Sequence, residues 1–173
     1  MPRSSEISAG LLAYRRRNGL EFLLAHPGGP YWASRDDGAW TIPKGQVRPD
    51  DLLAGALREF NEETGLTAQG PFTALAPVRL KSGKVVHAFA FESDFDLARF
   101  SSNTFEMEWP PRSGKLREFP EIDRIGWFGA GEALRKLIAY QRPFLHELQQ
   151  RLAETKSPPA AARQEAMSRG PAD

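Results

Sequence analysis

A single stretch with helical periodicity stands between two groups of strand-like segments. Over residues 51–64, apolar side chains recur every three or four positions, which predicts one amphipathic helix. The predicted inward-facing stripe consists of Leu53, Ala56, Leu57, Phe60 and Thr64. Gly65 follows where a left-handed cap commonly ends a helix. Asp50 and Asp51 precede the helix as candidate N-cap and first-turn residues, because negative charge is favoured at that end.

The flanking segments have the composition and turn signals of β-hairpins. The turn pairs are Asn18-Gly19, between residues 7–16 and 20–26, and Ser82-Gly83, between residues 72–80 and 85–92. The remaining expected strand-like pieces are an extended segment at 40–43 and strands at 104–109 and 124–129. A turn is expected at Lys44-Gly45 and loops at 27–39 and 110–124. One or two closing helices are expected over 132–140 and 143–154, broken by Pro143. Strands on both sides of one helix predict an α/β fold, with a mixed sheet covered by helices.

Composition limits the class of protein. The 173 residues suit one domain, 1–154, followed by a weakly ordered tail, 155–173, that has few large apolar groups. The absence of cysteine excludes disulfides and thiolate metal sites. The N-terminus lacks the apolar core of a signal peptide and no apolar run reaches ~18 residues, so we expect a cytoplasmic protein without a membrane span. The net charge of +1 gives no indication of nucleic-acid binding.

Three glutamates, Glu59, Glu62 and Glu63, lie within five residues of the predicted helix. Like charges three and four residues apart destabilise a helix by a few tenths of a kcal/mol per pair. A bound divalent cation would offset this repulsion, and carboxylate oxygens are the ligands that magnesium prefers. Arg58 is spaced to pair with Glu62. The same segment is also compatible with a solvated acidic face, a common feature of helices.

The surrounding residues resemble the Nudix box. That family pattern is a glycine, five residues, a glutamate, seven residues, and then Arg-Glu-apolar-x-Glu-Glu-x-Gly-apolar. The second half is matched at every specified position of 58–66. The first half, counted from Gly45, is one residue short, and Asp50 or Asp51 stands where glutamate is expected. The segment WTIPKG, 40–45, is similar to the lead-in of Nudix enzymes that act on dinucleoside polyphosphates and diphosphoinositol phosphates. The resemblance covers roughly residues 7–152 and implies an α/β/α sandwich.

The resemblance also implies a reaction. Nudix enzymes hydrolyse a P–O–P bond in compounds that contain a nucleoside diphosphate, with Mg²⁺ or sometimes Mn²⁺. Carried over residue by residue, the metal ligands are Glu59, Glu63 and the backbone carbonyl of Gly45. Glu62 is a further ligand or part of the water-activating network, and Arg58 positions the glutamates. A loop carboxylate, Glu121 in preference to Glu118, is a ligand or the general base, because it stands six residues before Trp127.

Substrate contacts are less defined by the sequence. Lys44 stands at the mouth of the predicted site, where it can contact phosphate. Other basic residues are contacts or ordinary surface charges: Arg79, Lys81, Lys84, Arg112, Lys115 and Arg117. Tyr31, Trp32 and Trp109 can stack on a base or anchor loops. We expect a dinucleoside polyphosphate such as diadenosine tetraphosphate, or a nucleoside triphosphate, as substrate of a monomer or homodimer. The alternative, motivated by the shortened box, is a non-catalytic nucleotide-binding module.

Overall fold

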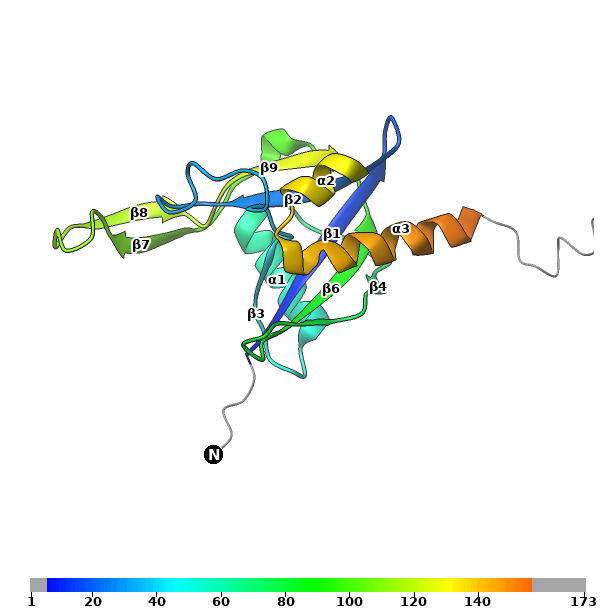
Figure 1. Cartoon of the computed structure of the whole chain (residues 1–173), viewed down its shortest axis with the longest axis horizontal. Coiled ribbons are helices and arrows are strands. Elements are labelled where there is room, and N and C mark those ends of the chain that lie inside the picture. Colours follow the sequence, from blue (N-terminus) through cyan, green and yellow to red (C-terminus); the bar gives the residue numbers. More distant parts are fainter. Residues whose placement is uncertain (1–5, 157–173) are drawn as a thin grey trace, which may run out of the picture.

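The computed structural model describes residues 6–156, and these form one mixed sheet between helices, with a projecting hairpin (Figure 1). The seven-stranded sheet consists of β1 (Ile7–Arg16), β2 (Leu20–Pro27), β3 (Lys44–Gln46), β4 (Thr73–Ala74), β5 (Val78–Arg79), β6 (Val85–Glu92) and β9 (Ile122–Gly129). The helices are α1 (Leu52–Thr64), α2 (Ala130–Lys136) and α3 (Arg142–Lys156), with short 3₁₀ turns at Leu97–Arg99 and Ala139–Gln141. Within residues 6–156, no helix is long and apolar enough to span a membrane.

Strand β1 organises the sheet, whose order is β4-β6-β1-β2-β9. It pairs in parallel with β6 along one edge, and the other edge is shared between two antiparallel partners. Near Tyr14 the partner is β2, and near Ala9 it is β3. Between them the chain is held by a hydrogen bond from the Leu11 amide to the Pro43 carbonyl, at 3.2 Å. This arrangement places Lys44 and Gly45 beside the centre of the sheet. They therefore belong to a strand and not to the predicted turn.

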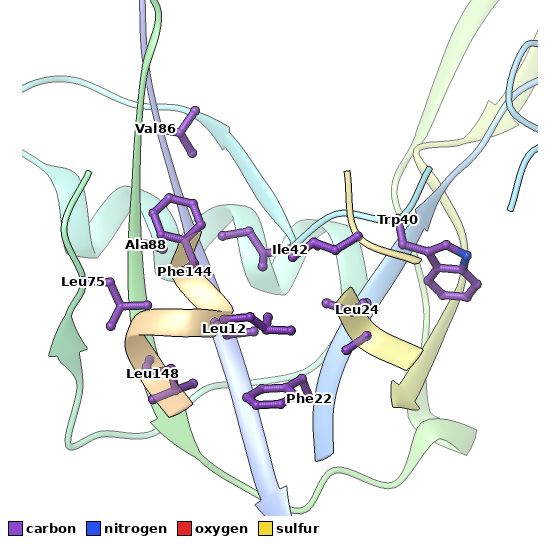
Figure 2. Packing of buried hydrophobic residues seen from close by; sticks show 14 residues of the cluster. Leu12, Phe22, Leu24, Trp40, Ile42, Leu75, Val86, Ala88, Phe144 and Leu148 are labelled. Carbon is purple, nitrogen blue, oxygen red and sulfur yellow. The ribbon is translucent and has the colours of Figure 1, made fainter. Parts of the chain in front are cut away.

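Successive residues of β1 face opposite sides of the sheet, as the two-residue period of a strand requires. On one face, Leu11 packs together with Ala9 and Ala13 in a cluster that includes Phe60 and Ala56 of α1. Leu12, on the other face, belongs to a second core cluster with Phe144 of α3. Figure 2 shows this second cluster, in which Phe144 and Leu148 lie over the sheet. The predicted α/β/α sandwich with a mixed sheet is confirmed.

Helix α1 has the predicted bounds to within one residue. Gly65 ends it in the left-handed conformation, with φ of 72°, and donates its amide hydrogen to the Asn61 carbonyl. Asp51 occupies the N-cap position, but its side chain makes no capping hydrogen bond. Its carboxylate instead lies 3.8 Å from the guanidinium of Arg58. The aspartates of the shortened box therefore start the helix by position, without the expected side-chain cap.

Two further predictions about elements differ from the structure. The segment 110–124 is not one loop, because β8 (Leu116–Pro120) pairs antiparallel with β7 (Thr104–Glu108) and forms the arm that projects from the sheet in Figure 1. The closing segment does form two helices, α2 and α3, but the break lies at 137–141 and not at Pro143. Pro143 lies in the first turn of α3, where a missing amide hydrogen costs nothing. The helix runs through Lys156, and the rest of the predicted tail, 157–173, lies outside the described residues.

Candidate active site

The site begins where β3 faces α1. A Cβ atom added to Gly45 would overlap the carboxylate of Glu59. The φ angle of Gly45 is not in the left-handed region, so this residue is required for its small size and not for its conformation. The absence of a side chain lets the Glu59 carboxylate rest directly against the backbone of β3. The backbone of Gly45 and the carboxylate of Glu59 therefore lie together, as the box pattern predicts.

Glu63 lies one helical turn further along α1 and is buried, with 8% of its surface exposed. Its Oε2 accepts a hydrogen bond from the backbone amide of Lys44 at 3.0 Å, which ties α1 to β3 a second time. Burial, followed by the nearby carboxylates of Glu59 and Glu121, raises the pKa of Glu63 to about 8, against the lowering effect of the Lys44 amide. A buried carboxyl group among like charges holds its proton, because the charged form lacks water and compensation.

The pKa of Glu59 is raised for similar reasons. Its partial burial is the largest cause, and the charge of Glu62 adds to it, while Arg58 on the same helix opposes the shift. Glu121 contributes again in the same direction. Glu59 and Glu63 therefore share one electrostatic environment with a residue that is about 60 positions away in the sequence. Perturbed carboxylates that gather in this way are typical of functional sites.

Glu121 reaches this environment through backbone hydrogen bonds. Its carbonyl accepts from the Gly28 amide at 2.8 Å, and its amide donates to the Asn103 carbonyl at 2.8 Å. The amide of Asn103 in turn donates to the Glu62 carbonyl at 2.9 Å, near the end of α1. One chain of main-chain contacts thus connects α1 to the segment that carries Glu121. The sequence favours Glu121 over Glu118 as the loop carboxylate of the site. The structure places Glu118 in the arm, opposite Glu106 in the β7–β8 pair.

Two further expectations for the box differ from the structure: the pairing of Arg58 with Glu62 and the convergence of the three helix glutamates. Arg58 pairs with Asp51 and not with Glu62, because its guanidinium turns toward the start of α1. Among residues 6–156, no three acidic or histidine side chains stand close enough to form a ready-made metal cluster. The expected convergence of Glu59, Glu62 and Glu63 is therefore not preassembled.

An open cavity of about 360 Å³ lies beside Lys44, Glu63 and Glu121. Its lining consists of Pro27, Gly28, Trp32, Thr41, Lys44, Glu63, Phe105, Glu121 and Ile122. Acidic groups and Lys44 thus share one space with two aromatic side chains, Trp32 and Phe105. Phe105 and Thr41 were not singled out from the sequence as site residues. The strand expected over 104–109 contains Phe105, but the sequence does not indicate that this side chain lies near the helix glutamates.

The remaining candidates for substrate contact lie elsewhere. Tyr31 and Trp109 pack edge-to-face on each other, with ring centroids 5.3 Å apart. Lys84, just before β6, pairs with Glu6 at 2.8 Å and does not line the cavity. The other late basic residues, Arg112, Lys115 and Arg117, belong to the arm formed by β7 and β8 and its connecting turn. Of the predicted phosphate contacts, Lys44 is the one that lines the cavity.

The donor set fits a hard divalent cation. The carboxylates of Glu59 and Glu63 and the backbone of Gly45 supply oxygen atoms, the ligand type that Mg²⁺ and Mn²⁺ accept. The contact between Gly45 and Glu59 would be lost with any larger residue at position 45. The raised pKa values of both glutamates mean that negative charge is insufficiently compensated there. A cation would supply that compensation.

Comparison with known proteins agrees with this architecture. Among solved structures, a Caenorhabditis elegans Ap4A hydrolase in a binary complex is 23% identical, with a TM-score of 0.59, over 86% of this chain and 98% of that one. A MutT protein from Methanosarcina mazei is 24% identical, with a TM-score of 0.54, over 87% and 97%. The NUDIX domain of Shewanella oneidensis NrtR, complexed with ADP ribose, is 14% identical, with a TM-score of 0.59, over 87% and 90%.

These structural similarities establish a shared fold. No curated protein matches the chain. The family model described as the NUDIX domain matches residues 5–148, which include every strand of the sheet and the whole of the cavity lining. The match confirms the family predicted from the second half of the box, and the chain belongs to the NUDIX domain family.

Proposed function

We propose that this Nudix pyrophosphohydrolase hydrolyses a P–O–P bond in a nucleoside-diphosphate-linked compound with the help of Mg²⁺, for which Mn²⁺ can substitute. The observation that carries the proposal is the pair Glu59 and Glu63, whose pKa values are raised by burial and by neighbouring carboxylates that include Glu121, beside a cavity lined by Glu63, Glu121 and Lys44. A cavity that contains both carboxylates, which can hold a cation, and a lysine, which can contact phosphate, suits a substrate with several phosphates.

The chain's own residues have separable roles in this proposal. Glu59, Glu63 and the carbonyl of Gly45 would hold the cation, with Glu121 and Glu62 as further ligands or members of the water-activating network. When bound, the cation supplies charge neutralisation and lowers the pKa of a water ligand. Lys44 neutralises a substrate phosphate, and Glu121, exposed at the cavity, accepts a proton from the attacking water. Arg58 supports the start of α1 through Asp51 and moderates the charge on Glu59.

The aromatic part of the cavity favours a nucleotide over a simple polyphosphate. Trp32 and Phe105 line the same space as Glu63 and Glu121, so a base stacked on either ring would leave its phosphates near the carboxylates. Within nucleotides we propose dinucleoside polyphosphates first, on the strength of the WTIPKG segment and the similarity to the C. elegans Ap4A hydrolase structure. Nucleoside triphosphates are the second candidate.

A non-catalytic binding module is the competing proposal, because the first half of the box is one residue short. The missing residue lies in the loop between β3 and α1, so the spacing of the glutamates within the helix is unchanged. The contacts of Glu59 with Gly45 and of Glu63 with the Lys44 amide are both made. A site that had lost its reaction would have no need of either contact.

A substrate panel tests the proposal. The purified chain is incubated with Mg²⁺ and diadenosine tetraphosphate, ATP, dATP or ADP-ribose, and the phosphate-containing products are separated. We expect cleavage of diadenosine tetraphosphate with the highest kcat/KM. Glu63→Gln is expected to lower kcat by about 10²–10³-fold, the loss typical of removing one preorganised electrostatic contact. Glu118→Gln, which changes the same group in the arm, serves as the matched control. Cleavage of none of the four compounds would leave the binding module as the better explanation.

A further inference from the structure

Strand β9 contains one extra residue immediately beside the site. Its pairing with β2 runs Ala25 with Ile125 and His26 with Arg124, but Pro27 then pairs with Ile122. Asp123 is therefore the additional residue of a β-bulge between His26 and Pro27. Bulges are common next to active sites, where they redirect a side chain.

The bulge decides which residue of the chain faces Gly28. With the shifted register, the Gly28 amide donates to the carbonyl of Glu121 at 2.8 Å. If the pairing of His26 with Arg124 continued without a bulge, Ile122 would stand opposite Gly28. Because side chains alternate between the two faces of a strand, a slip of one residue would turn Glu121 away from the cavity. The position of Glu121 thus depends on keeping Asp123 out of the ladder.

His26 holds the extra residue in place. Its side chain is completely buried, and its Nδ1 lies 2.8 Å from Oδ1 of Asp123. Its Nε2 lies 2.6 Å from the carbonyl oxygen of Arg35, to which it donates, because a carbonyl oxygen only accepts. The ring also packs edge-to-face on Trp40, with centroids 5.2 Å apart. A fully buried ring that is fixed at both nitrogens and on one face has little freedom to move.

We infer that His26 and Asp123 are positioning residues that set the register of β9, and through it place Glu121 at the cavity. The inference rests on the proposed function of Glu121. Neither residue lines the cavity, and both act through the backbone contact between Gly28 and Glu121. The same imidazole ring of His26 also contacts the Arg35 carbonyl. This second contact holds in place the loop that contains Trp32.

The first experiment measures rates in a double-mutant cycle. His26→Gln and Asp123→Ala are each made in the wild-type chain and in a Glu121→Gln background. Each is expected to lower kcat by about ten- to a hundredfold in the wild-type background, the effect of misplacing a catalytic group by about 1 Å. Each is expected to have little further effect when Glu121 is already changed. An equal loss in both backgrounds would overturn the inference, because a general loss of structure acts whether or not Glu121 is present.

Conservative and distant variants separate the contact from general damage. Asp123→Asn can accept a hydrogen bond from Nδ1 or donate one to it, so it is expected to recover most of the rate lost in Asp123→Ala. Asp37→Ala removes an exposed aspartate that pairs with Arg135 at 3.3 Å, and it is expected to leave kcat unchanged. Asp123→Ala changes a side chain at the surface and guards against loss of folding in His26→Gln. If Asp123→Asn were as slow as Asp123→Ala, the hydrogen bond would not be the cause.

The second experiment reads the register without any substrate. Amide hydrogen exchange of Gly28 and Glu121 is measured in the wild type, Asp123→Ala and Asp123→Asn. In the shifted register the Gly28 amide donates to the Glu121 carbonyl, and the Glu121 amide donates to the Asn103 carbonyl. We expect exchange at both amides to quicken at least tenfold in Asp123→Ala and to stay slow in Asp123→Asn. Unchanged exchange in Asp123→Ala would overturn the inference even if the enzyme is active. Quickened exchange would support it even if the substrate panel failed, so the two failures remain distinguishable.

Discussion

Glu63 carries the largest electrostatic cost in the site, since its pKa is raised to about 8 by burial, Glu59 and Glu121. Between the ordinary pKa of a glutamate and about 8, the folded metal-free chain binds a proton that the unfolded chain does not. The free energy of unfolding therefore falls as pH rises through this window, and the stabilisation is complete only below the unfolded pKa. The raised pKa of Glu59 acts in the same direction.

This sign gives a prediction for the metal-free protein. Glu63→Gln cannot lose a proton, so its free energy of unfolding is expected to fall much less between pH 6 and pH 8.5 than that of the wild type. The difference is expected to reach a few kcal/mol, as each pKa unit corresponds to about 1.4 kcal/mol. Denaturant unfolding at the two pH values, in the presence of a chelator, measures it. Equal slopes in the two proteins would show that Glu63 titrates normally.

Gly45 provides a second test at the residue scale. In Gly45→Ala, the new methyl group would meet the carboxylate of Glu59, which must turn away from β3. We expect kcat to fall by about a hundredfold, since a displacement of about 1 Å is enough for such a loss. Gly131→Ala is the matched control, because a Cβ at that position of α2 meets nothing within 4 Å. A normal rate in Gly45→Ala would remove this contact from the mechanism.

At the scale of elements, α1 and the arm differ in how far the sequence predicts them. The helix is predictable because its apolar stripe repeats at the helical period and Gly65 supplies a local stop signal. Strand β8 was missed because it is almost wholly exposed, with Phe119 as its one partly buried residue, and so lacks the alternating apolar signal of a strand packed on a core. The arm holds together through cross-strand contacts such as that between Phe105 and Phe119, with centroids 6.0 Å apart.

The arm is expected to contribute to substrate binding through one residue. Phe105→Ala removes an aromatic wall of the cavity and the contact of its ring with Gly29, so we expect KM for the nucleotide to rise severalfold, by about 1 kcal/mol of lost stacking. Since the glutamates of α1 are untouched, kcat should change little. Leu116→Ala, in the same arm but 71% exposed, is the control. Steady-state kinetics with both variants give the answer, and a loss confined to kcat would contradict this assignment.

On the scale of the whole molecule, the site is assembled from contacts that no local pattern encodes. Glu59 and Glu63 follow from helical spacing within one segment, and family resemblance adds Gly45 and Glu121. The bond between His26 and Asp123 joins residues 97 positions apart and depends on a bulge in the pairing of β2 with β9. Histidine in a strand and aspartate near a loop give no signal by themselves, so their meeting becomes visible only with the fold.

The two-sided architecture separates stability from activity. Phe144 of α3 and Phe60 of α1 are both fully buried, on opposite faces of one sheet, and replacing either by alanine should lower the free energy of unfolding by about 3–5 kcal/mol. Phe60 lies beside Glu59 on the helix that carries the carboxylates, whereas Phe144 supports the face away from them.

At temperatures where both variants remain folded, Phe144→Ala is expected to keep its kcat within about twofold, since distant sites behave independently. Phe60→Ala is expected to lose at least tenfold, because α1 can then shift against β3. Thermal unfolding followed by circular dichroism, with kcat measured below both transitions, tests the contrast, and equal losses of kcat would mean that the two faces are coupled through the sheet.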